Sequence, residues 1–253
     1  MNKLSNKKIL ITGASQGLGK ELALAFAKEN AEAISISARD KESLNEVAYQ
    51  INKISPSTLV IVIAGDLSLP EDVERIVATT LKAFGGRIDV LINNASAIGP
   101  TPMPYLLDYP LKDFNKVLNT NLVGPFLMIR HVLSSMIENG GSIINVTSDA
   151  GVIGYPGWGA YGISKFGLEG MSQTWASELQ DTSVRVNWVD PGSMNTSMHR
   201  AAEPDEDPKD WADPSTVTEV FVFLASDESI SVTGQRFQAQ ENWKEIIKTK
   251  HHA

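Results

Sequence analysis

Hydrophobic and polar positions along the chain alternate between two kinds of segment. Short, almost uniformly apolar runs occupy residues 8–12, 33–37, 59–64, 89–94, 142–148 and 184–189. Longer amphipathic segments follow them, over residues 17–29, 41–53, 70–84, 111–138, 158–180 and 214–226. Strands that are apolar on both faces, each followed by a helix, are typical of a parallel sheet covered on both sides. The pattern therefore predicts one doubly wound α/β domain.

Two segments depart from this alternation. Residues 203–213, "EPDEDPKDWAD", are acidic and contain two prolines, which predicts a loop. The last predicted strand lies in "GQRFQAQ", residues 234–240, and a polar tail follows it. We assign residues 1–240 to the domain and expect residues 241–253 to form a short frayed helix or to be disordered.

Composition narrows the classes of partner. The chain of 253 residues has no cysteine, which excludes disulfides and thiolate sites and suits a reducing cytoplasm. Its formal charge of −8, without a Lys/Arg cluster, argues against nucleic acid, and no segment approaches the ~18 apolar residues of a membrane span. The four histidines lack ligand-like spacing with carboxylates, so no metal site is predicted. The expected partner is a small molecule or another protein.

Two short motifs carry the candidate chemistry. In "TGASQGLG", Gly13, Gly17 and Gly19 follow the first strand and open a helix, where backbone N–H groups can hold a phosphate. The alternative is a glycine turn with no ligand. In "AYGISKFG", Tyr161 and Lys165 stand four positions apart, so they share one face of a helix. The alternative there is a solvent-facing stripe held by weak packing.

Further motifs stand in an order that links these two. They are "GDL" at 65–67, "NNAS" at 93–96, "NTN" at 119–121, Ser148, and "PG" at 191–192. With "TGASQGLG" and "YGISK", they make residues 7 to about 238 resemble the short-chain dehydrogenase/reductase family, in its compact branch of roughly 250 residues that includes NADP-dependent carbonyl and 3-oxoacyl reductases. The resemblance implies a Rossmann-type sheet in three α/β/α layers and a dinucleotide-binding catalytic domain.

The resemblance also implies which residues bind the cofactor. The glycine turn would contribute Gly13, Ser15, Gln16, Gly17, Leu18 and Gly19, and Asp66 with the Leu67 backbone would hold the adenine. Asn93 and Ala95 would lie along the cofactor, and Pro191, Gly192, Met194 and Thr196 would lie near the nicotinamide together with Tyr161 and Lys165.

The end of the second predicted strand bears on the choice of cofactor. This position reads the adenosine ribose, where a carboxylate favours NAD and an arginine accommodates the 2′-phosphate of NADP. The strand ends with Ala38 and Arg39, so we predict NADP(H), with NAD(H) as the alternative. Gln16 stands where phosphate-preferring relatives often carry a basic residue. Asp40 either pairs with Arg39 or caps the next helix.

The catalytic residues implied by the resemblance are Asn121, Ser148, Tyr161 and Lys165. Tyr161 would be the general acid in reduction and the general base in oxidation. The ammonium of Lys165 is expected to lower the pKa of Tyr161 and to reach the nicotinamide ribose. Ser148 would bind the substrate oxygen and the Tyr161 hydroxyl; its rival, Thr147, should face the opposite side of the strand. Asn121 would help to position a water near the lysine, with Asn119 as its rival.

The substrate is less closely defined than the reaction. A small carbonyl or alcohol compound is expected, in a pocket formed by Ile98, Tyr155, Trp158, Met194 and Met198, with His199 at its mouth. The alternative is ordinary loop and helix packing for these residues, with His199 in a solvent-facing loop. The acidic loop 203–213 should repel an anionic carrier or thioester. The alternative from another class is a non-catalytic NADP(H) sensor or scaffold. A homotetramer or homodimer is expected, with helices 111–138 and 158–180 packed between subunits.

Overall fold

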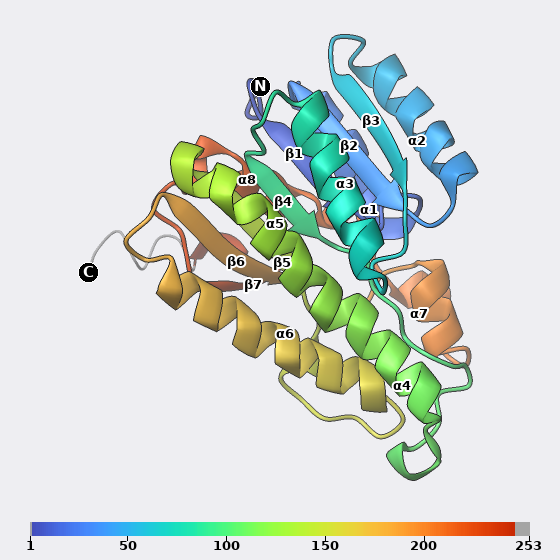
Figure 1. The fold of residues 1–253 in the computed structure, drawn as a ribbon. Coiled ribbons are helices and arrows are strands. Elements are labelled where there is room, and N and C mark those ends of the chain that lie inside the picture. The colour runs from blue at the N-terminus through green and yellow to red at the C-terminus, as the bar shows by residue number, and fades with distance from the viewer. Residues whose placement is uncertain (1, 246–253) are drawn as a thin grey trace.

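A seven-stranded parallel sheet forms the centre of the computed structural model, which describes residues 2–245 (Figure 1). Its strands are β1 (Lys8–Thr12), β2 (Ala33–Ala38), β3 (Leu59–Ala64), β4 (Val90–Asn93), β5 (Gly141–Val146), β6 (Val184–Asp190) and β7 (Arg236–Gln238). They lie in the order β3-β2-β1-β4-β5-β6-β7, and every neighbouring pair is parallel. The order reverses between β1 and β4, so the carboxyl ends of these strands diverge into a crevice that can hold a ligand.

Helices cover both faces of the sheet, as the alternation predicts. They are α1 (Gly17–Lys28), α2 (Lys41–Ile54), α3 (Pro70–Ala83), α4 (Leu111–Leu118), α5 (Gly124–Asn139), α6 (Gly159–Glu178), α7 (Ser197–Ala202) and α8 (Glu219–Ala225). One face packs against α1, α2 and α8, and the other against α3, α5 and α6 (Figure 1). The predicted doubly wound, three-layer fold is confirmed.

Alternation along each strand divides the core into two layers. Ile9 and Ile11 of β1 join the cluster under α1 and α8, whereas Leu10 between them joins the cluster under α3 and α5. All three side chains are fully buried. Each contributes roughly 1.5–3 kcal/mol by leaving water, which explains why the strands are apolar at every position.

The predicted helix over residues 111–138 is interrupted. A single π-helical turn, Asn119–Val123, lies between α4 and α5. It contains the buried Asn121, whose side chain bonds to a neighbouring loop, and such turns often occur at functional sites. The predicted helix 214–226 is likewise divided, into a 3₁₀ turn at Pro214–Val217 and α8. The pattern did not predict α7.

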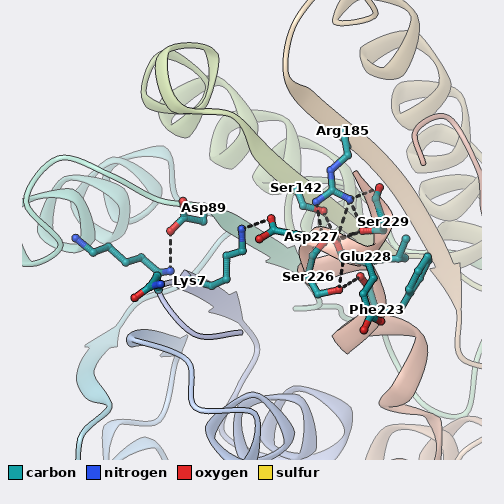
Figure 2. A network of polar contacts seen from close by, with 12 residues as sticks. Lys7, Asp89, Ser142, Arg185, Phe223, Ser226, Asp227, Glu228 and Ser229 are labelled. Carbon is teal, nitrogen blue, oxygen red and sulfur yellow. Dashed lines mark hydrogen bonds and ion pairs between the residues drawn. The ribbon is translucent and has the colours of Figure 1, made fainter. Parts of the chain in front are cut away.

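A polar network fixes the segment after α8 to the amino ends of the neighbouring strands (Figure 2). Arg185 at the start of β6 donates to the backbone oxygens of Ser229 at 2.7 Å and Leu224 at 3.3 Å, and also to the Ser229 hydroxyl. Ser142 of β5 donates to the same Leu224 oxygen at 2.8 Å. Burial lowers the pKa of Arg185 to about 10, opposed only in part by the charge of Asp227. The network ties α8 to the sheet at the edge opposite the crevice.

The start of the predicted tail packs against this region. Trp243 is buried, and its ring centroid lies 5.4 Å from that of Phe223. Lys244 pairs with Glu219 at 2.7 Å. Residues 243–245 are helical, as one of the two alternatives expected, but Trp243 is packed on an apolar ring of α8 and is not frayed. Residues 246–253 lie outside the described part of the chain.

Across residues 2–245, none of the helices combines the length and the apolar character that crossing a bilayer requires.

Candidate active site at the carboxyl edge of the sheet

Two adjoining cavities lie at the carboxyl ends of the strands, with volumes of about 380 and 310 Å³. The larger one, here called the cofactor cleft, extends from the glycine turn past the ends of β2 and β4. The smaller one, the substrate pocket, lies between the segments after β5 and β6. Tyr161, Thr147, Pro191, Met194, Thr196 and Met198 line both. Ligands bound in the two cavities would therefore meet at these six shared residues.

The glycine turn is packed tightly against the segment after β4. Gly13 has a φ of +67°, and a Cβ there would lie 2.7 Å from the Cα of Ala95. A Cβ on Gly19 would overlap the carbonyl oxygen of Gly13. Asn94 holds this arrangement, because its Nδ2 donates to the backbone oxygens of Thr12 at 2.9 Å and Gly13 at 3.0 Å. Sequence reasoning missed Asn94, although it stands in the quoted motif "NNAS".

Most of the predicted cofactor residues line the cofactor cleft. They are Gly13, Ser15, Gln16, Gly17, Leu18, Arg39, Asp66, Leu67, Ala95, Tyr161, Lys165, Pro191, Met194 and Thr196. Gly192 lines the substrate pocket instead, and Gly19 lies behind the glycine turn. Asn93 is buried below the cleft, where its Nδ2 donates to Asn145 at 2.9 Å. Its side chain serves the pairing of β4 and β5 and is not brought to the cleft.

The residues of the cleft fit a dinucleotide. Helix α1 begins at Gly17 without a side-chain cap, so the backbone N–H groups of its first turn have no side-chain acceptor and face the glycine turn. A phosphate is the natural acceptor at such a helix start. Asp66 is held by its own turn, since its Oδ1 accepts from the Ser68 N–H at 2.9 Å and the Ser68 hydroxyl at 2.8 Å.

The neighbouring side chains of Arg39 and Asp40, at the end of β2, have different surroundings. Asp40 caps α2, accepting from the N–H groups of Glu42 at 3.1 Å and Ser43 at 3.3 Å, so the capping alternative is confirmed. The Ser43 hydroxyl and these N–H groups hold the pKa of Asp40 below its usual value. Arg39 is exposed at the cleft lining, and within residues 2–245 no ion pair joins it to Asp40. Its guanidinium is therefore available to a ligand in the cleft.

Tyr161 and Lys165 lie on one face of α6 at the junction of the two cavities. The Lys165 Nζ donates to the Val146 backbone oxygen at 2.8 Å and lies 5.4 Å from the centroid of the Tyr161 ring. Burial lowers the pKa of Lys165 to about 8, against the opposing charges of Asp190 and Glu169. Both side chains are buried, at 2% exposure for Lys165 and 9% for Tyr161.

The expected lowering of the Tyr161 pKa is wrong for this structure. Burial raises that pKa above its ordinary value, the hydrogen bond with Ser148 lowers it, and the charges of Asp190 and Asp149 raise it further. Lys165 is not among the groups that shift this pKa, since its ammonium lies over the ring and bonds to the Val146 oxygen.

Ser148 and Thr147 face opposite ways, as the alternation predicts. The Ser148 side chain contacts the Tyr161 hydroxyl, donates to Asp149 at 2.8 Å and accepts from the Ala150 N–H at 3.2 Å. Thr147 donates to the buried Glu169 at 2.8 Å. Ser148 is thus the hydroxyl beside the tyrosine.

Asn121 is engaged by a loop and by α6. Its Oδ1 accepts from the Ala97 N–H and its Nδ2 donates to the Ala97 oxygen, both at 2.8 Å, and Nδ2 also donates to Ser164 at 3.0 Å. Its side chain therefore fixes the segment after β4 against α6. The water-positioning role expected for Asn121 stays a prediction.

The substrate pocket combines apolar walls with carboxylates. Ile98, Tyr155, Trp158, Met194, Met198 and His199 all line it, as the sequence predicts. Asp149, Asp190, Glu203 and Glu206 line it as well. Glu203 accepts from the indole of Trp158 at 3.2 Å, so the acidic loop supports the wall of the pocket. Asp190 was missed because it reads as the end of an apolar strand.

Comparison with known proteins agrees with this geometry. Residues 7–207 match the family model described as short chain dehydrogenase. The chain is 38% identical to the 3-oxoacyl-[acyl-carrier-protein] reductase FabG of Thermotoga maritima, covering 92% of this chain and 96% of the relative. It is 34% identical to the glucose 1-dehydrogenase of Gluconobacter oxydans, covering 92% and 90%.

Among solved structures, a short-chain dehydrogenase of Shigella flexneri complexed with NADP superposes with a TM-score of 0.88 at 30% identity, covering 95% of this chain and all of the other. The matched model spans well over half of the chain and includes the glycine turn, Ser148, Tyr161 and Lys165. The protein is therefore an oxidoreductase of the short-chain dehydrogenase family.

Proposed function

We propose that the protein interconverts a carbonyl compound and the corresponding alcohol with NADP(H), using Tyr161 as the general acid and base. The observation that carries this proposal is the meeting of Tyr161, Ser148 and Lys165 where the cofactor cleft adjoins the substrate pocket. When bound, the cofactor supplies the hydride donor or acceptor. The chain itself then has to bind the carbonyl oxygen and move one proton.

Ser148 would bind the carbonyl oxygen, and Tyr161 would transfer the proton. The Ser148 hydroxyl is placed to orient the substrate oxygen beside the phenol, which it already contacts. In reduction Tyr161 gives its proton to that oxygen, and in oxidation it takes the proton back. A raised pKa keeps the buried phenol protonated, and a nearby cation is needed both to make it a better acid in reduction and to favour phenolate in oxidation. Lys165 is the nearest candidate for this cation. Its ammonium would have to turn from the Val146 oxygen toward the Tyr161 hydroxyl and the nicotinamide ribose.

The preference for NADP(H) rests on Arg39. An exposed guanidinium at the rim of the cofactor cleft, with its neighbour Asp40 committed to α2, can pair with a 2′-phosphate. The NADP complex of the Shigella flexneri relative supports the same choice.

The lining of the substrate pocket favours an uncharged substrate. Asp149, Glu203 and Glu206 have only neutral hydrogen-bond donors among the described residues, so an anionic substrate would meet uncompensated negative charge. The carrier-protein substrate of the Thermotoga maritima relative is disfavoured on this ground, and neutral ketones, aldehydes and sugars are preferred.

One experiment tests these points together. NADPH and NADH are titrated by fluorescence, and turnover is then measured with neutral ketones, aldehydes, aldoses and acyl thioesters, in parallel with Tyr161→Phe. We expect tight NADPH binding by both proteins and a loss of turnover by roughly 10²–10⁴-fold in Tyr161→Phe. Binding without any turnover would favour the sensor, and full activity of Tyr161→Phe would refute the proton-transfer role.

Assembly through α5 and α6 forms part of the proposal. Val123, Phe126, Ile163 and Phe166 are 37–46% exposed on these helices or beside them, so a partner subunit packed there would bury apolar side chains. A homodimer or homotetramer would cover it, and light scattering of the purified protein measures which one forms.

A further inference from the structure

A buried ion-pair cluster lies directly behind the catalytic residues. Arg236 at the start of β7 donates from Nε to Glu169 of α6 and from Nη2 to Asp190 of β6, both at 3.0 Å. The side chains of Glu169 and Asp190 are only 7% and 6% exposed, and that of Arg236 is 22% exposed. Burial opposes the charge of Arg236, yet its bonds to the two carboxylates raise its pKa above the usual value.

Each member of the cluster also holds a part of the active site. The Arg236 Nη2 donates to the backbone oxygen of Ser148 at 3.3 Å. Asp190 accepts from the Gly192 N–H at 2.9 Å, which fixes the Pro-Gly turn at the substrate pocket. Glu169 accepts from Thr147 at 2.8 Å, next to Ser148 in sequence. Arg236 therefore links the segments after β5 and β6 and the middle of α6.

The charges around the catalytic pair are mostly negative. Asp190 and Glu169 stabilise the ammonium of Lys165, and Asp190 and Asp149 oppose the phenolate of Tyr161. Glu203, Glu206 and His199 line the far side of the substrate pocket. Among the described residues, Arg236 is the cation that forms ion pairs with Asp190 and Glu169, because Lys165 bonds to the Val146 oxygen instead.

We propose that Arg236 is a positioning residue that partly neutralises Asp190 and Glu169, so that these two carboxylates act less strongly on the charges of Lys165 and Tyr161. This inference rests on the proposed function. An arginine suits the task because its planar fork reaches two carboxylates and a backbone oxygen at once. A lysine at position 236 could supply the charge but not all three bonds.

The first test measures Lys165 directly, in protein without cofactor. Lysine labelled with carbon-13 at Cε is titrated by NMR, and the resonance absent from Lys165→Met identifies residue 165. The wild-type midpoint is expected near 8. Arg236→Met removes the positive charge and leaves two carboxylates to favour the ammonium, so the midpoint should rise by roughly one pH unit or more. Adding Asp190→Asn to that variant should lower the Lys165 midpoint again.

Arg185→Met is the matched control. Arg185 is also a partly buried arginine, at the start of β6, but its partners lie at the opposite edge of the sheet (Figure 2). Its loss should lower stability and leave the Lys165 midpoint unchanged. An equal shift in the two arginine variants, or no shift in Arg236→Met, would overturn the inference. If Arg236→Met does not fold, Arg236→Gln takes its place, because its amide can still donate to a carboxylate but carries no charge. The Lys165 midpoint should rise in that variant, and an unchanged midpoint would overturn the inference.

The second test uses turnover. In the oxidation direction the rate should rise with pH as Tyr161 loses its proton, and Arg236→Met should move this rise to higher pH by roughly one unit. Arg236→Lys should keep the wild-type pH dependence. A wild type without turnover would defeat the proposed function, whereas a wild type with turnover and an unshifted profile in Arg236→Met would defeat only this inference.

Discussion

The ammonium of Lys165 lies 5.4 Å from the centroid of the Tyr161 ring and donates its hydrogen bond to the Val146 oxygen, at the end of β5. The pair thus meets through the face of the ring. Because Lys165 is buried and its pKa falls to about 8, it is charged at neutral pH in an environment that disfavours charge. Holding it there reduces the stability of the folded protein, which is a common property of active sites.

Replacing Lys165 should therefore stabilise the protein while it abolishes turnover. The unfolded state holds the lysine proton up to pH 10.5 and the folded state only to about 8, so stability from this group rises with pH between these values. Lys165→Met should unfold at a higher urea concentration at pH 7, by ~2–3 kcal/mol in free energy. The advantage should shrink toward pH 10. If Lys165→Met is less stable than wild type at pH 7, burying the Lys165 ammonium does not lower the free energy of unfolding.

Asn94 should control cofactor affinity through the glycine turn. Asn94→Ala removes the donor to the Thr12 and Gly13 oxygens, so the turn loses its support and stability falls by about 1–3 kcal/mol. NADPH binding should weaken by at least ~10-fold, measured by fluorescence titration. Asn93→Ala is the matched control, because it disrupts the buried bond to Asn145 without touching the turn. Equal loss of affinity in both variants would argue against a specific role for Asn94.

Arg39 should distinguish the two cofactors. Arg39→Ala removes the cation at the cleft rim and should weaken NADPH binding by ~10–100-fold, the range of one charge-assisted hydrogen-bonded pair, with NADH binding unchanged. Lys41→Ala, a nearby cation at the first position of α2, should leave both affinities as they are. If Arg39→Ala weakens NADH equally, the residue acts on the fold of the cleft and not on the 2′-phosphate.

The C-terminal segment should contribute to stability. Trp243 packs on Phe223 of α8, so Trp243→Ala should lower the free energy of unfolding by about 3 kcal/mol. Truncation after Gln240 should lower it at least as much, whereas truncation after Glu245 keeps Trp243 and its ring contact. Urea unfolding of the three proteins, together with their size in solution, measures the effect. Unchanged stability after Gln240 would show that the segment contributes little.

The chain's own residues determined the layers and the local chemistry. Apolar runs and amphipathic segments give nearly the observed strand and helix bounds, since periodicity reports burial directly. The glycine turn and the shared helix face of Tyr161 and Lys165 are also local, because they depend on residues only a few positions apart. For the same reason the resemblance could place Ser148 and Arg39 at the cavities without coordinates.

Tertiary structure decided which distant groups meet. Arg236 is 46 residues from Asp190 and 67 from Glu169, and they come together because β6 and β7 are neighbours and α6 packs beside them. Likewise, only the packing of β4 on β5 directs Asn93 into the core and leaves Asn94 to hold the glycine turn. The direction of the Lys165 ammonium depends on a backbone oxygen of another element. A one-dimensional pattern records periodicity and spacing, but such contacts depend on the order of strands in space.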